Sequence, residues 1–186
     1  WNASCLPGGR YGIPEAWTPI NYGDTNYKTT TVIDGLANSY NTITLAEANQ
    51  LDLCKFQEMA FAAGIHNGKS SGGENVPLEV NPPSSFGGGG DASPLAMATG
   101  FATFAAEGLK CEPRALESVT AVDGRTFEVP PQDCQQVMKK EVAQGVNAAT
   151  QQVMTKGSGQ LLQIGLPVAG KTGTNDYRSQ TWFMGY

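Results

Sequence analysis

The ten residues GLPVAGKTGT, positions 165–174, constrain the fold more than any other stretch, because two incompatible local structures fit them. From Gly165 to Thr172 the letters meet the spacing G-x-x-x-x-G-K-T of a phosphate-binding loop. Such a loop needs a helix that begins at the Lys-Thr pair, because amides at the helix N-terminus bind the phosphates. Here a glycine and further polar residues follow, and the next apolar residues, Trp182–Met184, have the pattern of a strand. The sequence therefore favours a strand over a nucleotide site.

As a strand, this segment carries one lysine and two threonines on a glycine-rich backbone. Alternation along a strand places Lys171 and Gly173 on one face. Thr172 and Thr174 then lie on the opposite face, and the glycines let a ligand approach closely. An ammonium beside two hydroxyls supplies charge and hydrogen bonds to an anionic group, so we predict an anion site here. The short motif alone leaves a second interpretation open, a glycine-bearing strand with a solvated lysine.

A second polar motif lies far upstream, between two predicted helices. Ser39 and Asn41 form an S-x-N triplet in the sequence LANSYNT. Serine and asparagine are common helix caps, and taken by themselves these two residues are best explained as caps. They become candidates for a site shared with K-T-G-T only through the resemblance to a known family that the surrounding segments show.

The remaining pattern indicates an α/β fold in which helices cover an antiparallel sheet. Helical patterns are found over residues 29–36, 44–49, 56–65, 93–108 and 135–154. Strand patterns are found in a hairpin over 115–129, which turns at Asp123-Gly124, and over 166–174 and 180–186, which residues 175–178 join. Residues 1–28 and 69–90 are rich in glycine, proline and polar residues and are predicted to be irregular.

Two of these helices carry expectations about burial. The helix that Ser93 caps, with Pro94 at its first position, is apolar almost all round, so we expect it in the core. In the helix over 135–154 we expect one stripe to face the core, and Gly157 and Gly159 to end the helix. The stripe comprises Val137, Val142, Val146, Ala149 and Val153, and only Glu141 breaks it.

Length and charge narrow the class of protein. With 186 residues, the chain suits one domain or part of a larger one, and its ends favour a part. Acidic residues outnumber basic ones, 17 to 12, and no basic cluster exceeds the pair Lys139 and Lys140, so nucleic-acid binding is not expected. No apolar run reaches the roughly 18 residues that span a bilayer, so any membrane anchor is expected outside this chain.

The four cysteines show no C-x-x-C spacing, so we expect no zinc or other metal site. An even number of separated cysteines permits two disulfides in an oxidising compartment. We pair Cys111 with Cys134 because the predicted hairpin lies between them, which leaves Cys5 for Cys54. Four free buried thiols are the alternative.

Longer segments around both motifs resemble the transpeptidase domain of class A (bifunctional) penicillin-binding proteins over nearly the whole chain. These segments are YGIPEAWTPINY, LANSYNT, SPLAMATGFATFAAEG with CEPRA shortly after, and PVAGKTGTNDYRSQTWFMGY. K-T-G is itself one of the motifs of serine β-lactamases and penicillin-binding proteins. The resemblance implies the β-lactamase/transpeptidase fold, of which residues 1–186 would be the C-terminal part. The paired cysteines suggest an actinobacterial member.

The resemblance also implies a role for each motif residue. Ser39 would relay a proton toward the leaving nitrogen, and Asn41 would hold a peptide carbonyl of the substrate. Lys171 would supply positive charge near Ser39. Thr172 and Thr174 would bind the substrate carboxylate, with Gly173 between them, and the Thr174 N–H would be one oxyanion donor.

The partners implied are peptidoglycan stem peptides and β-lactams at the extracytoplasmic face of the bacterial membrane, without a cofactor. The rest of the protein, including its glycosyltransferase domain, would be a further partner. The chain departs from the family at one point, because no serine in it has a lysine three residues later. The S-x-x-K nucleophile is therefore absent, and the chain alone is predicted to be inactive. A non-catalytic relative that binds cell-wall peptides is the alternative.

Overall fold

The computed structural model of the protein describes residues 1–12, 17–24, 29–86, 90–175 and 178–186. The helices are α1 Val32–Ala37, α2 Asn41–Ala48, α3 Leu53–Ala62, α4 Pro94–Ala105 and α5 Lys140–Lys156. The strands are β1 Asn67–Ser71, β2 Glu74–Val76, β3 Leu109–Cys111, β4 Val119–Thr120, β5 Thr126–Phe127, β6 Cys134–Gln136, β7 Gly170–Thr174 and β8 Thr181–Gly185. Short 3-10 turns are η1 Pro7–Gly9, η2 Tyr22–Asp24, η3 Pro82–Phe86 and η4 Gln160–Leu162.

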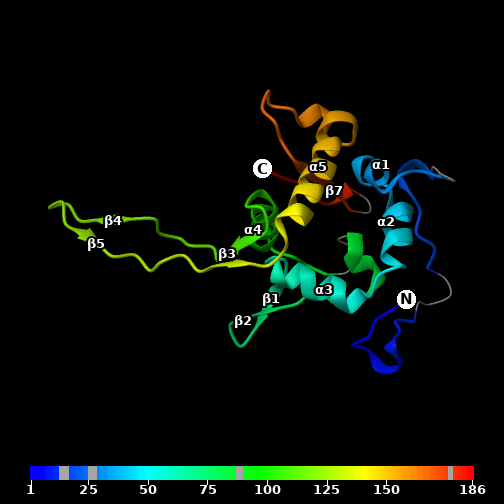
Figure 1. Ribbon diagram of the computed structural model, residues 1–186, viewed down its shortest axis with the longest axis horizontal. Coiled ribbons are helices and arrows are strands. Elements are labelled where there is room, and N and C mark those ends of the chain that lie inside the picture. The colour runs from blue at the N-terminus through cyan, green and yellow to red at the C-terminus, as the bar shows by residue number, and fades with distance from the viewer. Residues whose placement is uncertain (13–16, 25–28, 87–89, 176–177) are drawn as a thin grey trace.

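The strands pair only as antiparallel couples within this part of the chain: β1 with β2, β3 with β6, β4 with β5, and β7 with β8. The β7–β8 pair packs against α5 and α4, and α1 packs against α5. In the view of Figure 1, α1 and α2 lie on one side of α5 and α4 lies on the other. This arrangement confirms the predicted helices over an antiparallel sheet. Parts of the segments 1–28, 69–90 and 175–178 fall on residues 13–16, 25–28, 87–89 and 176–177, which lie outside the described residues.

Both predicted disulfides are present. Cys5 is bonded to Cys54, which fixes the irregular N-terminal segment to the start of α3. Asp52 caps this helix: its Oδ1 accepts hydrogen bonds from Cys54 N at 2.9 Å and from Ser4 N at 3.1 Å. Cys111 is bonded to Cys134 across β3 and β6, at the base of the long arm that ends in the β4–β5 hairpin (Figure 1).

Helix α5 begins at Lys140, so the predicted start at residue 135 is wrong. The residues before it, Cys134–Gln136, pair with β3 and are held there by the disulfide, so this segment is a strand. The predicted stripe is also wrong in part, because Val142 is exposed whereas Val153 is buried. The buried positions of α5 are Ala143, Thr150, Val153 and Met154. Ala143 packs with Ala63 and Met138, and Phe104 of α4 packs against the same cluster.

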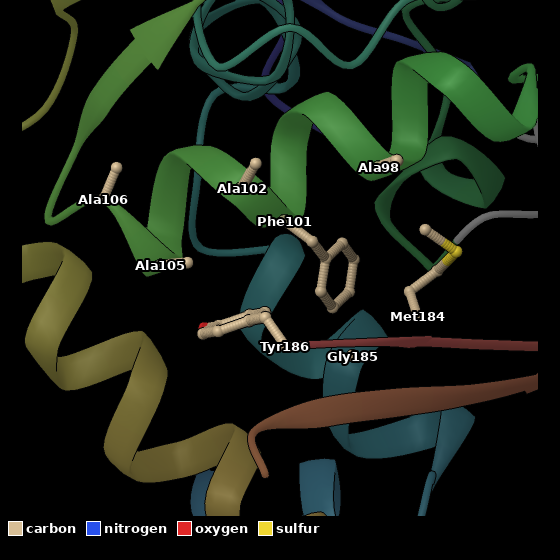
Figure 2. Close-up of a pocket in the computed structure, with 8 residues that line it drawn as sticks. All are labelled: Ala98, Phe101, Ala102, Ala105, Ala106, Met184, Gly185 and Tyr186. Carbon is tan, nitrogen blue, oxygen red and sulfur yellow. The ribbon is translucent and has the colours of Figure 1, made fainter.

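Helix α4 starts as predicted, since the Ser93 hydroxyl accepts a hydrogen bond from Ala96 N at 3.1 Å. It is buried on one face only, at Ala96, Gly100 and Thr103. The opposite face, including Phe101, borders an open apolar pocket of about 460 Å³ that it forms with the end of β8 (Figure 2). The prediction of a core helix therefore holds for one face of α4 only, among the described residues.

The prediction of an irregular segment over 69–90 is wrong at its start. Residues 67–76 form the β1–β2 hairpin. Gly72 and Gly73 make its turn, with φ of +63° and +85°, which glycine adopts without a steric penalty. Helices α2 and α3 begin three residues earlier than predicted, at Asn41 and Leu53.

Candidate functional site

Ser39 lies in the tight connection between α1 and α2. Thr31 caps α1 through its hydroxyl, which accepts from Asp34 N at 3.1 Å. The helix ends with Tyr40 N donating to Gly35 O at 2.8 Å. Ser39 has φ of +60°, a left-handed conformation that costs a non-glycine residue about 1–2 kcal/mol. The turn leaves Ser39 exposed at the junction of the two helices, where the S-x-N motif was predicted to lie.

Strand β7 has one edge that is not paired with β8, and the backbone N–H and C=O groups along that edge face the junction of α1 and α2. Ala169 and Tyr186 exchange two backbone hydrogen bonds of 3.0 Å, and Asn175 N donates to Gln180 O at 3.2 Å. In an antiparallel pair such bonded positions alternate with unbonded ones. The alternation directs the backbone N–H and C=O groups of Thr172 and Thr174 away from β8, toward the outer edge of β7.

Lys171 joins the two motifs. Its Nζ donates hydrogen bonds to Ser39 Oγ at 2.7 Å and to Thr172 O at 2.9 Å, across 132 residues of sequence in the first case. Burial lowers the pKa of Lys171 from 10.5 to about 8, because desolvation penalises the charged form. No carboxylate among the described residues forms an ion pair with Lys171. The Lys171 ammonium is therefore hydrogen-bonded to a hydroxyl and a carbonyl, but no carboxylate of the described residues neutralises its charge. This positive charge can attract an anionic ligand.

Asn41 is held separately. Its Nδ2 donates to Ile20 O at 2.9 Å, and no hydrogen bond between described residues connects it to Ser39 or Lys171. The neighbouring Thr42 N donates to Asn21 Oδ1 at 3.1 Å, so residues 20–21 lie along the start of α2. The amide of Asn41 retains a second N–H and its oxygen for a ligand.

Thr172 has a partner that the sequence interpretation missed. Its Oγ1 lies 2.5 Å from the hydroxyl of Ser158, which follows α5. Ser158 N donates to Ala37 O at 2.9 Å, two residues before Ser39. The sequence shows that Ser158 lies between the two glycines that end α5, Gly157 and Gly159. Only the fold shows that its hydroxyl faces β7.

The ends of α1 and α5 are fastened together beside the site. Lys156 Nζ lies 2.7 Å from Asp34 Oδ1, and this contact lowers the pKa of the Asp34 carboxyl. A Cβ on Gly157 would lie 2.0 Å from Ala37 O, so only glycine permits the observed approach of the two helices. These contacts fix the Ser39 turn relative to β7.

The structure thus excludes the phosphate-binding loop. Gly170–Thr174 is a strand paired with β8, and no helix starts at Lys171. The ammonium is directed to Ser39 and not toward a ring of backbone amides.

Comparison with known proteins shows which family the chain belongs to. The family described as penicillin binding protein transpeptidase domain matches residues 6–186. This chain belongs to the penicillin-binding protein transpeptidase family. The predicted class A transpeptidase domain is confirmed, whereas the actinobacterial origin stays a prediction.

Curated penicillin-binding proteins match most of the chain. Penicillin-binding protein 1A of Aquifex aeolicus (strain VF5) is 28% identical over 174 residues, which cover 92% of this chain and 22% of the relative. Penicillin-binding protein 1B of Escherichia coli (strain K12) is 27% identical over 178 residues, which cover 92% of this chain and 20% of the relative. The chain therefore spans about a fifth of the length of these relatives.

Solved penicillin-binding proteins share the fold. Penicillin-binding protein 1A from Haemophilus influenzae has a TM-score of 0.80 at 16% identity, covering 95% of this chain and 31% of that one. The D,D-transpeptidase domain of a peptidoglycan glycosyltransferase from Eggerthella lenta has a TM-score of 0.71 at 23% identity, covering 89% and 47%. The predicted β-lactamase/transpeptidase-like fold is confirmed.

None of the helices in the described ranges is both long and apolar enough to cross a membrane. No three His, Cys, Asp or Glu side chains within those ranges are placed to hold a metal ion.

Proposed function

We propose that this chain forms two walls of the active site of a peptidoglycan D,D-transpeptidase that passes through an acyl-serine intermediate and is acylated by β-lactams. The contact between Lys171 Nζ and Ser39 Oγ, 2.7 Å, is the observation that carries the proposal, because it joins the K-T-G and S-x-N motifs. Residues 1–186 are proposed to be the C-terminal part of the transpeptidase domain. The protein would act outside the cytoplasmic membrane.

The first wall of the site is the S-x-N motif, Ser39 and Asn41, which would transfer a proton and bind the peptide of the substrate. Lys171 donates to Ser39, so the Ser39 hydroxyl is free to donate its own proton to the leaving nitrogen of the D-Ala-D-Ala bond or the β-lactam. Asn41 would bind a substrate carbonyl through its second amide N–H. Its bond to Ile20 O would keep that amide in place while substrate binds.

The second wall of the site is the K-T-G-T motif of β7, which would bind the terminal carboxylate and the oxyanion. Thr172 and Thr174 alternate with Gly173, so the two hydroxyls lie on the same face of β7. The Thr174 N–H, which is not used by β8, would donate to the oxyanion of the tetrahedral intermediate. The unpaired charge of Lys171 would attract the carboxylate.

The acylated serine would come from another part of the protein. No serine of this chain has a lysine three positions later, so the chain cannot supply S-x-x-K. A segment of the rest of the penicillin-binding protein that carries S-x-x-K is therefore a required partner, and a glycosyltransferase domain would belong to the same protein. A non-catalytic relative that only binds cell-wall peptides is the second candidate, which the missing motif favours.

Labelling with a fluorescent penicillin separates these candidates. The intact protein is expected to gain the mass of one penicilloyl group, whereas residues 1–186 alone gain none. An intact protein that folds but takes up no penicillin would identify the non-catalytic relative. Covalent labelling of the isolated chain would contradict the assignment of the nucleophile to another segment.

The acylation rate is expected to depend on the charge of Lys171. Because its pKa is about 8, the second-order rate constant of the intact protein should fall roughly tenfold per pH unit above that value, as the free enzyme loses the ammonium. Arginine stays protonated at these pH values, so Lys171→Arg should lower the rate but remove this limb. Stopped-flow acylation between pH 6 and 10 measures this pH dependence in the wild type and in Lys171→Arg. A limb of equal pKa in the arginine variant would assign the titration to another group.

A further inference from the structure

We infer that Ser158 is a positioning residue for carboxylate recognition: its hydroxyl orients that of Thr172, so that Thr172 donates its proton to the terminal carboxylate of the stem peptide or β-lactam. The inference rests on the proposed function and deepens it. Its starting observation is the 2.5 Å distance between Ser158 Oγ and Thr172 Oγ1.

The direction of the hydrogen bond follows from the number of protons. Each hydroxyl has one proton, and a carboxylate only accepts. If Thr172 donates to the carboxylate, its oxygen must accept from Ser158. Without Ser158, the Thr172 hydroxyl would lose this acceptor role and rotate among its three staggered positions. Ser158 therefore selects the rotation in which the Thr172 proton faces the ligand.

Ser158 is itself held by backbone contacts on both sides. Ser158 N donates to Ala37 O at 2.9 Å, and Gly159 N donates to Val153 O at 2.9 Å. Gly157 lies against Ala37, where a Cβ has no space. Ser158 is exposed, but these contacts with α1 and α5 hold its backbone, and therefore the position from which its hydroxyl reaches Thr172.

The same contacts connect the two walls. Ala37, which accepts from Ser158 N, precedes Ser39 by two residues, and Thr172 follows Lys171 directly. Ser158 thus touches the S-x-N side through its backbone and the K-T-G side through its hydroxyl. It holds the carboxylate subsite at a fixed distance from the proton-relay pair of Ser39 and Lys171.

The test compares a penicillin with its methyl ester in the intact protein. Ser158→Ala should lower the second-order acylation constant for the free acid about tenfold, the effect of one hydrogen bond to a charged group. The ester lacks the charge that Thr172 recognises, so its constant should change less than about twofold. Ser158→Thr keeps the hydroxyl and should restore the preference for the acid. Thr155→Ala is the matched control, because Thr155 Oγ1 donates only to Gln151 O within α5.

A double-mutant cycle tests the route through Thr172. In a Thr172→Val background, Ser158→Ala should cause no further loss toward the acid. Equal losses for acid and ester, or additive losses in the double variant, would overturn the inference. A wild-type protein that reacts with neither compound would overturn the proposed function and this inference together, whereas a reactive wild type with an unchanged Ser158→Ala variant overturns only the inference.

Discussion

Lys171→Met in the intact protein is expected to lower the second-order rate constant of acylation by penicillin about a thousandfold, the loss expected when a central electrostatic donor is removed. The substitution removes the hydrogen bond to Ser39 Oγ and the positive charge that Lys171 would place beside the carboxylate subsite. Methionine is similar in length and unbranched, so the space is kept. Stopped-flow acylation measures the loss.

The same substitution is expected to leave thermal stability unchanged or to raise it at neutral pH. The pKa of Lys171 is about 8 in the folded protein and 10.5 when exposed, so burial of its charge costs about 3 kcal/mol below pH 8. Between these values the unfolded chain binds a proton that the folded chain has released, so stability rises with pH in the wild type. In Lys171→Met this contribution to the rise between pH 8 and 10.5 should be absent.

Lys139→Met is the matched control. Lys139 is exposed at the start of α5, at the opposite end of the helix from Gly157, and should affect neither rate nor stability. A Lys171→Met variant that acylates normally would refute the proposed role of this lysine. A variant that loses both activity and folding would show that Lys171 is structural.

The long, strongly patterned elements could be predicted from the sequence. Ser93-Pro94 gives the start of α4 because capping and the proline ring act within one turn. The glycines of the turn at residues 72 and 73 signal a hairpin, but the flanking residues are polar and lack the alternation that identifies a strand. The start of α5 could not be predicted, because residues 134–136 form a strand only through their pairing with β3.

The site could be predicted as two motifs but not as a set of contacts. Lys171 and Ser39 are assigned to one site by the resemblance of their motifs to the family, and the structure brings their side chains within 2.7 Å. The partners of Asn41 and Thr172, Ile20 O and Ser158 Oγ, depend on which segments pack beside α2 and β7. A backbone carbonyl carries no sequence signal, and a serine after a helix is ordinary, so only the fold identifies them.

Gly157→Ala is expected to be the most damaging single change to the scaffold of the site. The added Cβ would lie 2.0 Å from Ala37 O and 2.6 Å from Ala37 C, both backbone atoms that cannot rotate away. The clash should cost about 3 kcal/mol, which in a domain of this size lowers the midpoint of thermal inactivation by about 10 °C. Because α1 must move to relieve the clash, penicillin acylation should also fall at temperatures where the protein remains folded.

Gly145→Ala, a glycine-to-alanine change within α5, is expected to stabilise the protein, in contrast to Gly157→Ala. Gly145 lies on the exposed side of α5, with no atom within 4 Å of an added Cβ, so alanine should stabilise the protein by up to about 1 kcal/mol. The temperature at which half of the penicillin labelling is lost compares both variants with the wild type. If Gly157→Ala were as stable and active as Gly145→Ala, the close approach of α1 and α5 would not be what holds Ser39 and Ser158 against β7.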